Sequence, residues 1–371
     1  MRTEVLLYAY GMICASMIIF NIIYSMIVNG REPRLERKYK RIMKRIEQQL
    51  DGIRDGERVE EKHLRYLERK LSHVSTLLAF DRVMTDLIRT ESDAAVRGYL
   101  QQIQPVILHL ALVYRKRESV QAAYFAYFLA KHKLKKRMQM DGLQQVMVEY
   151  MRMDSLYCRV NALDALYTFG SPENIVEAIL LQDKKGAFFH EKILTEGLMT
   201  FEGDHDQLIL LLWEQFEKFS LRTQLAVLNY IRFRTGNDKK RMFEIMTDEK
   251  RNKELRFAAI RYMGRYVYAP AKEPLIAFVL DKDPLRWEYA AISATALGRY
   301  QGKEVTDALM EAMHSFNWYV RYNAASSLQE QGLNYTDLID IVGGRDRYAR
   351  EMLMYLMDSK RLERGREAAE G

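Results

Sequence analysis

The chain has 371 residues, of which 48% are hydrophobic and 29% are charged, and its formal net charge is +7. This composition is typical of a folded protein and excludes an intrinsically disordered chain. The length allows one large solenoid or two ordinary domains. The two cysteines, Cys14 and Cys158, have neither the spacing of metal ligands nor a disulfide framework, so we expect unpaired thiols in a reducing compartment.

The first element expected in chain order is a membrane-spanning helix. Residues 5–28 read VLLYAYGMICASMIIFNIIYSMIV, without a charge. A helix of that length crosses a hydrocarbon core of roughly 30 Å. A cleaved signal peptide usually has an apolar core of only about 7–15 residues and small residues at its cleavage site, which this segment lacks. A buried helix of a soluble protein is the other alternative. We therefore predict a transmembrane helix over residues 5–28 after a short extracytoplasmic N-terminus, residues 1–4.

Positive charge is concentrated directly after this segment. Residues 29–50 have a local charge of +5, which leaves only +2 for residues 51–371. The basic residues are Arg31, Arg34, Arg37, Lys38, Lys40, Arg41, Lys44 and Arg45. Because positive loops stay in the cytoplasm, we expect a single-pass protein of the cell membrane with its N-terminus outside and the rest cytoplasmic. The same residues are candidates for contact with anionic headgroups, although they could equally be a topology signal alone.

A helical connector is expected next. Apolar residues recur every three or four positions in the basic juxtamembrane segment, residues 29–58, which predicts one helix that ends near the turn signals Asp51-Gly52 and Asp55-Gly56. Within residues 59–116 we expect a second helix over roughly 59–90. A third helix follows over about 93–114, and Pro105 should kink it or divide it in two.

A short phrase then repeats along the chain. Its last apolar residue falls at positions spaced 32, 33, 32, 34 and 31 residues apart. These positions are Leu166, Leu198, Ile231, Met263, Leu297 and Leu328. The clearest copies begin at Arg159, Arg256 and Arg321 and read RVNALDAL, RFAAIRYMG and RYNAASSL. A near-constant period of this size is typical of stacked helical repeats.

Each repeat predicts two antiparallel helices joined by a short turn. The turn is clearest at Gly170-Ser171-Pro172, where we expect a left-handed glycine at the end of the first helix, and a serine cap and first-turn proline in the next. The arginine that opens the phrase should pair with an acid or a carbonyl of a neighbouring unit. Two units depart from the phrase: one has Glu191 in place of the arginine, and another has extra residues before Gly298.

The phrase and its period resemble the HEAT-repeat superfamily, in the short form common in bacterial proteins. The resemblance covers residues 154–343 and extends more weakly to a divergent first repeat at 117–153, with a cap helix and polar tail over 344–371. It implies an all-α fold, a right-handed α-α superhelix of about six to seven helical pairs that follows the transmembrane helix and the connector.

No catalytic constellation is evident. The seven histidines form no metal-ligand pair, and the run Gly203-Asp204-His205-Asp206 lies where a turn between helices belongs. No nucleophile motif or phosphate-binding loop is present. We therefore predict no catalytic, cofactor or metal site, and a protein that is not an enzyme.

Two sets of residues are candidates for contact with a partner. One is a charge run, which could also be a solvated face: Lys131, Lys133, Lys135, Lys136 and Arg137. The other is aromatic, and some of its members must belong to the core: Tyr266, Tyr268, Trp318 and Tyr319.

These features predict a membrane-anchored cytoplasmic scaffold whose repeats bind a protein, itself a membrane protein or part of a membrane complex. The layout is similar to that of membrane-anchored HEAT-repeat proteins that accompany bacterial glycosyltransferases in polysaccharide synthesis and export. The alternatives are a nucleic-acid-binding HEAT-like protein, which the small charge of residues 51–371 disfavours, and a HEAT-like enzyme of the bilin-lyase type, for which no catalytic residues are evident.

Overall fold

A computed structural model describes residues 2–90, 93–134, 141–184, 186, 189–333, 336–356 and 358. For residues 2–7, 9, 22, 23, 25–31 and 141 it describes the backbone alone. The described residues form helices and the turns between them, with no strand. The contacts divide the chain into two units, Met1–Ala187 with Thr200–Leu211, and Phe188–Met199 with Leu212–Gly371.

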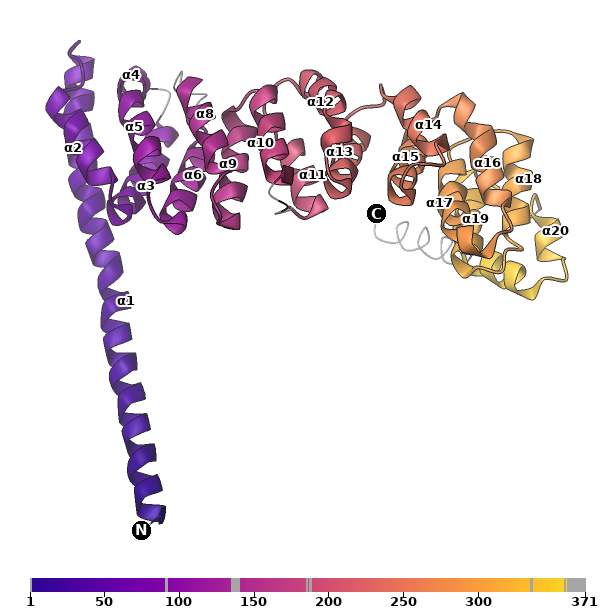
Figure 1. The fold of residues 1–371 in the computed structure, drawn as a ribbon, viewed down its shortest axis with the longest axis horizontal. Helices are drawn as coiled ribbons and strands as arrows, with labels where there is room; N and C mark the ends of the chain where they lie inside the picture. The colour runs from indigo at the N-terminus through magenta and orange to yellow at the C-terminus, as the bar shows by residue number, and fades with distance from the viewer. Residues whose placement is uncertain are drawn as a thin grey trace, which may run out of the picture. The chain divides into compact units, whose positions relative to one another are not determined.

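The first unit begins with one long helix, α1 (Arg2–Arg54), which extends well beyond the helices that pack against its C-terminal half (Figure 1). The later helices of this unit are α2 (Glu61–Leu71), α3 (Val74–Arg89), α4 (Ala94–Gln102), α5 (Gln104–Arg115), α6 (Ser119–His132), α8 (Asp141–Tyr150), α9 (Leu156–Phe169) and α10 (Pro172–Lys184). Ile42, Ile46 and Leu50 of α1 are buried, which confirms the apolar stripe predicted there.

The segment predicted to span a membrane and the basic segment after it belong to this single helix, which continues through Pro33 and ends just before the Asp55-Gly56 turn. Among the residues that the structure describes, no helix has the length and apolar character needed to cross a membrane. The membrane span over residues 5–28 therefore stays a prediction from the sequence.

The connector has four helices where two were expected. The single helix predicted over residues 59–90 is wrong, because α2 ends at Leu71 and α3 begins at Val74. His73 takes an extended backbone conformation between them, and it therefore cannot continue the helix. The division predicted at Pro105 is confirmed: α4 ends at Gln102, and the proline lies in the first turn of α5, where its missing N–H is tolerated.

The second unit repeats one arrangement. Its first helices are α11 (Glu191–Met199), α13 (Leu221–Arg234), α15 (Lys253–Arg265), α17 (Trp287–Leu297) and α19 (Trp318–Glu330). Its second helices are α14 (Lys239–Thr247), α16 (Lys272–Leu280), α18 (Lys303–Ala312) and the short α20 (Ile339–Val342). The helix α12 (His205–Glu214) contributes residues to both units.

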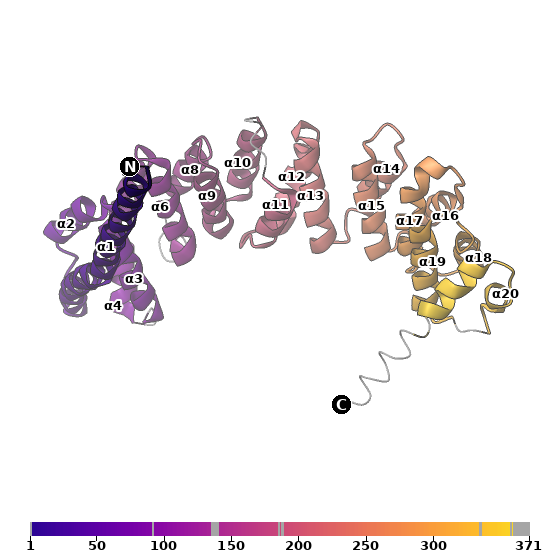
Figure 2. The same cartoon turned by 90° about the horizontal axis from the view of Figure 1, so that it is seen from below.

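Within the second unit the helices form two layers. The helices α13, α15, α17 and α19 lie side by side in one layer (Figures 1 and 2). The second helices pack against the first helix of the following repeat, α14 on α15, α16 on α17 and α18 on α19. The first unit follows the same rule at α8 and α9. The right-handed stacking of the pairs stays a prediction from the family resemblance.

The repeated apolar positions form the core. Each of the six residues that end the phrase is fully buried: Leu166, Leu198, Ile231, Met263, Leu297 and Leu328. Polar side chains cap the first helices at their N-termini. The Ser220 hydroxyl accepts a hydrogen bond from the Thr223 N–H, and the side-chain oxygen of Asn317 accepts one from the Tyr319 N–H. The period predicted from the sequence is thus the period of the packing.

The turn at Gly170 differs from the expectation in its backbone. Gly170 has φ −72° and ψ 164°, so it is extended rather than left-handed. A Cβ at this position would lie 2.5 Å from the carbonyl oxygen of Leu166, which explains the glycine by close approach of the chain. Ser171 accepts from the N–H of Asn174, and Pro172 is the first residue of α10, as predicted.

Candidate ligand-binding surfaces

The arginines that open the repeated phrase have a structural role. Arg159 donates through Nη1 to the carbonyls of Met153 and Asp154, at 2.9 and 2.7 Å. Arg256 is buried and donates through Nε to the carbonyl of Met246, the last turn of α14, at 3.0 Å. These carbonyls precede the helix that carries each arginine, which confirms the predicted pairing with a carbonyl.

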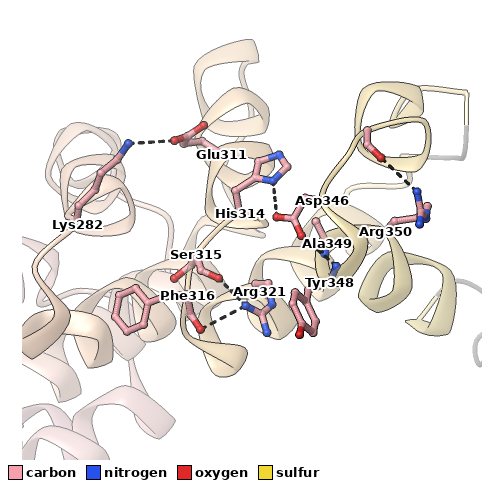
Figure 3. Close-up of polar contacts among 11 residues, drawn as sticks. Lys282, Glu311, His314, Ser315, Phe316, Arg321, Asp346, Tyr348, Ala349 and Arg350 are labelled. Carbon is pink, nitrogen blue, oxygen red and sulfur yellow. Dashed lines mark hydrogen bonds and ion pairs between the residues drawn. The ribbon is translucent and has the colours of Figure 1, made fainter.

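Figure 3 shows the same contact in the last copy, at Arg321, and in the cap that follows it, at Arg350. Arg321 points back to the carbonyls of Ser315 and Phe316, at 2.6 and 3.3 Å. Arg350 makes the corresponding bond to Gly344 at 3.2 Å. Because a charged donor satisfies the free carbonyls where each repeat joins the next, these arginines stabilise the junctions between repeats.

The structure also accounts for two of the copies that lack the arginine. In the repeat that ends at Ile231, Gln224 takes the position and donates through Nε2 to the carbonyl of Phe216 at 2.9 Å. The departure at Glu191 serves a different contact, since its carboxylate accepts from the side-chain amide of Asn229. Sequence reasoning missed that Gln224 occupies the position of the arginine. The only signal for it was its place seven residues before Ile231 in the repeat.

The charge run proposed for partner contact is partly occupied by internal pairs. Lys131 lies 2.9 Å from the carboxylate of Asp81, and His132 is 2.5 Å from the same group. Burial acts to raise the pKa of Asp81, but the hydrogen bonds from His132 and Lys131 outweigh it and lower that pKa overall. Lys133 forms an ion pair with Glu202. Lys135, Lys136 and Arg137 lie outside the described residues.

The aromatic candidates separate into two groups. Tyr266 packs against Tyr262 with ring centroids 4.9 Å apart, and the Tyr268 ring meets Phe243 at 5.7 Å. The Tyr268 N–H donates to the hydroxyl of Tyr300 at 3.3 Å. Both tyrosines are only partly exposed. The contacts of Tyr268 join adjacent repeats, whereas Tyr266 packs on a residue of the helix that it caps.

Trp318 and Tyr319, in contrast, are 50% and 57% exposed at the start of α19. Tyr319 stacks on Trp287 at 5.6 Å, and Trp318 stacks on Tyr322 at 5.0 Å. Phe316, two residues before Trp318, and Leu285, two residues before Trp287, are also exposed. We call these six residues the aromatic patch: Leu285, Trp287, Phe316, Trp318, Tyr319 and Tyr322. Trp287 and Tyr322 are only partly exposed, but a group of stacked rings with exposed members is typical of a contact surface.

An arginine groove crosses the layer of first helices. It encloses about 960 Å³ and is lined mainly from α13, α15 and α17, with Asn323 and Glu330 from α19. Its cationic residues are Arg232, Arg261, Arg265 and Arg299. Phe233 and Val267 contribute apolar surface to the same groove, and each is nearly half exposed. Sequence reasoning missed these arginines, because Arg261 occupies a variable position of the repeated phrase and the other three follow its last apolar residue.

The groove has a positive potential that its own residues do not neutralise. Burial lowers the pKa of the Arg232 guanidinium, and the neighbouring charges of Arg261 and Arg265 lower it further. The Nε of Arg232 has no hydrogen-bond acceptor. Glu330 is the one acid among the described residues of the lining. A groove with apolar walls and several like charges is suited to an acidic ligand.

The groove and the aromatic patch meet on α19. Tyr319, Asn323 and Glu330 are spaced four and seven residues apart, which places them on one face of that helix. Tyr319 belongs to the patch, whereas Asn323 and Glu330 line the groove. The two features are therefore neighbouring parts of one surface in the second unit.

The residues predicted to lie at a membrane surface line two hollows in the first unit. Lys38, Arg41 and Arg45 line a cleft of about 620 Å³ between α1 and α2. Arg34 and Arg37, again with Lys38 and Arg41, line an adjacent hollow of about 710 Å³. Lys40 and Lys44 are exposed and line neither. The side chain of Arg31 lies outside the described residues.

The acidic run near His205 is a helix cap. Asp204 accepts through Oδ1 from the N–H groups of Asp206 and Gln207, at 2.9 and 3.0 Å, and so begins α12. In the part of the chain that the structure describes, no three histidine, cysteine or acidic side chains gather closely enough to hold a metal ion.

Comparison with known families gives a partial match. A family model described as HEAT repeats matches residues 240–329, the segment that contains α15, α17 and most of the arginine groove. No curated protein matches the chain. The match, the period and the all-helical layers together identify residues 240–329 as HEAT repeats within a HEAT-like repeat protein.

Proposed function

We propose that the chain is a non-catalytic HEAT-repeat scaffold that is tethered to a membrane and binds a protein partner through an acidic segment. The observation that carries this proposal is the arginine groove with the aromatic patch beside it. Tryptophan, tyrosine and arginine are the residues most enriched at the energetic centres of protein interfaces. HEAT repeats also suggest a protein-interaction role, because their stacked helices present extended surfaces rather than enclosed pockets.

The tether is part of the same proposal. From Tyr8 to Tyr24, α1 exposes a succession of large apolar side chains. These are Tyr8, Tyr10, Met12, Ile13, Met17, Ile18, Ile19, Phe20 and Tyr24. An apolar helix surface of this length is costly in water, and a bilayer would cover it on every side. The partner that we expect is a component of a membrane complex, with a polysaccharide-synthesising glycosyltransferase as the example that the family resemblance offers.

The partner surface is tested by charge reversal in the full chain. The variant Arg261→Glu/Arg299→Glu inverts two exposed groove charges, and the control Lys240→Glu/Lys303→Glu inverts two exposed charges on the second helices. Cross-linking and mass spectrometry on membranes should recover the partner with the original chain and the control. The groove variant should reduce that recovery by about tenfold or more, as expected for the loss of interfacial charge pairs. Equal recovery by all three chains would contradict the proposed surface.

Nucleic-acid binding is the alternative that an arginine groove also favours. It is examined with duplex and single-stranded DNA at low ionic strength, where phosphate contacts are strongest. Tight DNA binding that is lost in Arg261→Glu/Arg299→Glu and kept in the control would replace the protein partner with a nucleic acid.

A further inference from the structure

A second basic surface lies in the first unit, on residues outside the segment 240–329 that matches the HEAT-repeat model. Among the described residues, the lining of the cleft between α1 and α2 has seven cationic side chains and no acidic one. They are Lys38, Arg41, Arg45, Lys62, Arg65, Arg69 and Lys70. The composition of the N-terminal segment predicts only the first three, because the other four lie beyond the basic cluster in the sequence.

Helical spacing brings the charges into two facing stripes. On α1, Lys38, Arg41 and Arg45 are spaced three and four residues apart. On α2, Lys62, Arg65 and Arg69 have the same spacing. Three residues with this spacing lie on one face of a helix, and both faces line the same cleft. Such an arrangement matches a ligand that carries more than one negative charge.

Few of these charges are neutralised within the chain. Arg65 pairs with Glu61 at 2.5 Å, Arg45 lies 4.1 Å from the centre of the Tyr66 ring, and Lys38 donates to the Ser75 hydroxyl at 2.6 Å. The remaining four have no ion pair or hydrogen bond to a described residue: Arg41, Lys62, Arg69 and Lys70. Like charges that converge without an acid focus a positive potential into the cleft.

The walls of the cleft are held by the core. Leu67 and Leu71 of α2 are fully buried, and His63 is fixed by a 2.9 Å hydrogen bond to the Tyr99 hydroxyl. Ile42 of α1 is buried at the base. The charged stripes therefore project from helices whose opposite faces are packed, which reduces the entropy lost when a ligand binds.

The adjacent hollow adds apolar surface. It shares Lys38 and Arg41 with the cleft and is lined also by Leu35 and by Leu78, which is 39% exposed. Cations beside the half-buried Leu35 and the exposed Leu78 suit a molecule with an anionic head and a hydrocarbon tail. Guanidinium and ammonium groups are the side chains that bind phosphate best.

We propose that the α1–α2 cleft binds the phosphate headgroup of an anionic phospholipid, with the acyl region toward Leu35 and Leu78. The site shares no residue with the arginine groove. The proposal rests on the proposed function only because the tether is what brings the cleft to a membrane. A free polyphosphate shares the phosphate chemistry and is the other source of such a ligand.

The test uses the full chain in a non-ionic detergent and two probes, a short-chain anionic phospholipid and inorganic tripolyphosphate. Titration calorimetry compares the original chain with Lys62→Gln/Arg69→Gln, which removes two unpaired cleft charges. The matched control is Lys40→Gln/Lys44→Gln, which removes the same charge from the exposed surface of α1 outside the cleft. We expect the cleft variant to weaken lipid binding by about tenfold or more and the control to change it by about twofold or less.

The outcomes distinguish a lipid site from a site for a soluble ligand and from diffuse surface charge. Loss of lipid binding in the cleft variant alone confirms the site, and tripolyphosphate bound in preference to lipid assigns the cleft to a soluble ligand and overturns the lipid. If lipid binding weakens equally in both variants, it depends on diffuse surface charge, and a defined site in the cleft is overturned. The proposal is also overturned if the original chain binds neither probe. Cross-linking of the cleft variant on membranes, as described for the groove variant, measures whether it still recovers the protein partner. This separates a failure of the lipid site from a failure of the proposed scaffold function.

Discussion

At the scale of single residues, the polar side chains in the core act as connectors between repeats. Arg256 is 5% exposed, donates to the Met246 carbonyl, and lies 4.8 Å from the centre of the Tyr289 ring. Arg256→Met keeps much of the volume but leaves that carbonyl without its donor. We expect a loss of about 2–3 kcal/mol in the free energy of unfolding.

The same helix offers a control. Arg261 is exposed and lines the groove, so Arg261→Met should change the free energy of unfolding by less than about 0.5 kcal/mol. Urea unfolding followed by circular dichroism measures both variants. Equal stability of the two would show that the repeated arginine contributes nothing to the fold.

His63 predicts a pH dependence. Burial, followed by the positive charge of Arg45, lowers the pKa of His63 to about 4. The unfolded chain takes up this proton near its ordinary pKa of about 6.5, whereas the folded chain does not, so stability falls as the pH drops from about 6.5 towards 4 and is level above that range. Between pH 7 and pH 5 the contribution amounts to about 2 kcal/mol.

The variant His63→Gln isolates this contribution, because glutamine does not titrate. Urea unfolding at pH 7 and pH 5 should show the original chain losing about 2 kcal/mol more than the variant. The same loss in both chains would assign the acid sensitivity to other groups.

At the scale of elements, small residues set how closely the first helices approach. A Cβ at Gly264 would lie 2.9 Å from the Cα of Ala296, where α15 meets α17. Gly264→Ala should therefore force these helices apart and destabilise the chain by about 1–3 kcal/mol. Thermal unfolding, monitored by circular dichroism, gives the measurement.

Gly98 serves as the matched control for this substitution. A Cβ there would meet only the side chain of Ile53, at an ordinary 3.5 Å. Since alanine favours a helix more than glycine does, Gly98→Ala should leave α4 unchanged or stabilise it by up to about 1 kcal/mol. A comparable loss at both glycines would mean that the contact between α15 and α17 is not tight.

The repeated elements could be predicted because packing at a constant period imposes a constant pattern. Leu297 and Leu328 are fully buried as their spacing indicates, and Arg321 binds carbonyls as expected. The break at His73 could not be predicted, because the apolar residues on either side of it, Leu71, Val74 and Leu78, keep a helical spacing of three and four. The two basic surfaces could not be found either, because they unite residues from different helices. Arg41 and Arg69, for example, are 28 residues apart in the sequence and line the same cleft only in the folded chain.

At the scale of the whole molecule, neighbouring repeats are joined by a succession of weak contacts. Ion pairs at about one repeat spacing include Arg251 with Glu217 at 2.6 Å, Lys272 with Glu304 at 2.8 Å, and His314 with Asp346 at 2.9 Å (Figure 3 shows the last). One partner of each pair is exposed and the other is half-buried, and pairs accessible to solvent contribute little to the free energy of unfolding. The buried apolar anchors therefore carry the stability, and the polar surface is free to vary with the ligand.

The proposed tether makes a prediction for the full chain in cells. A chain that lacks residues 2–28 should move from the membrane pellet to the supernatant, because the apolar part of α1 is the segment that a bilayer would hold. Alkaline carbonate washing distinguishes the modes of attachment, since it removes proteins that are bound only by charge and leaves an inserted helix in place. The original chain and the cleft variant Lys62→Gln/Arg69→Gln should both resist the wash. Release of the original chain by carbonate would contradict a spanning helix and would leave the basic cleft as the means of membrane contact.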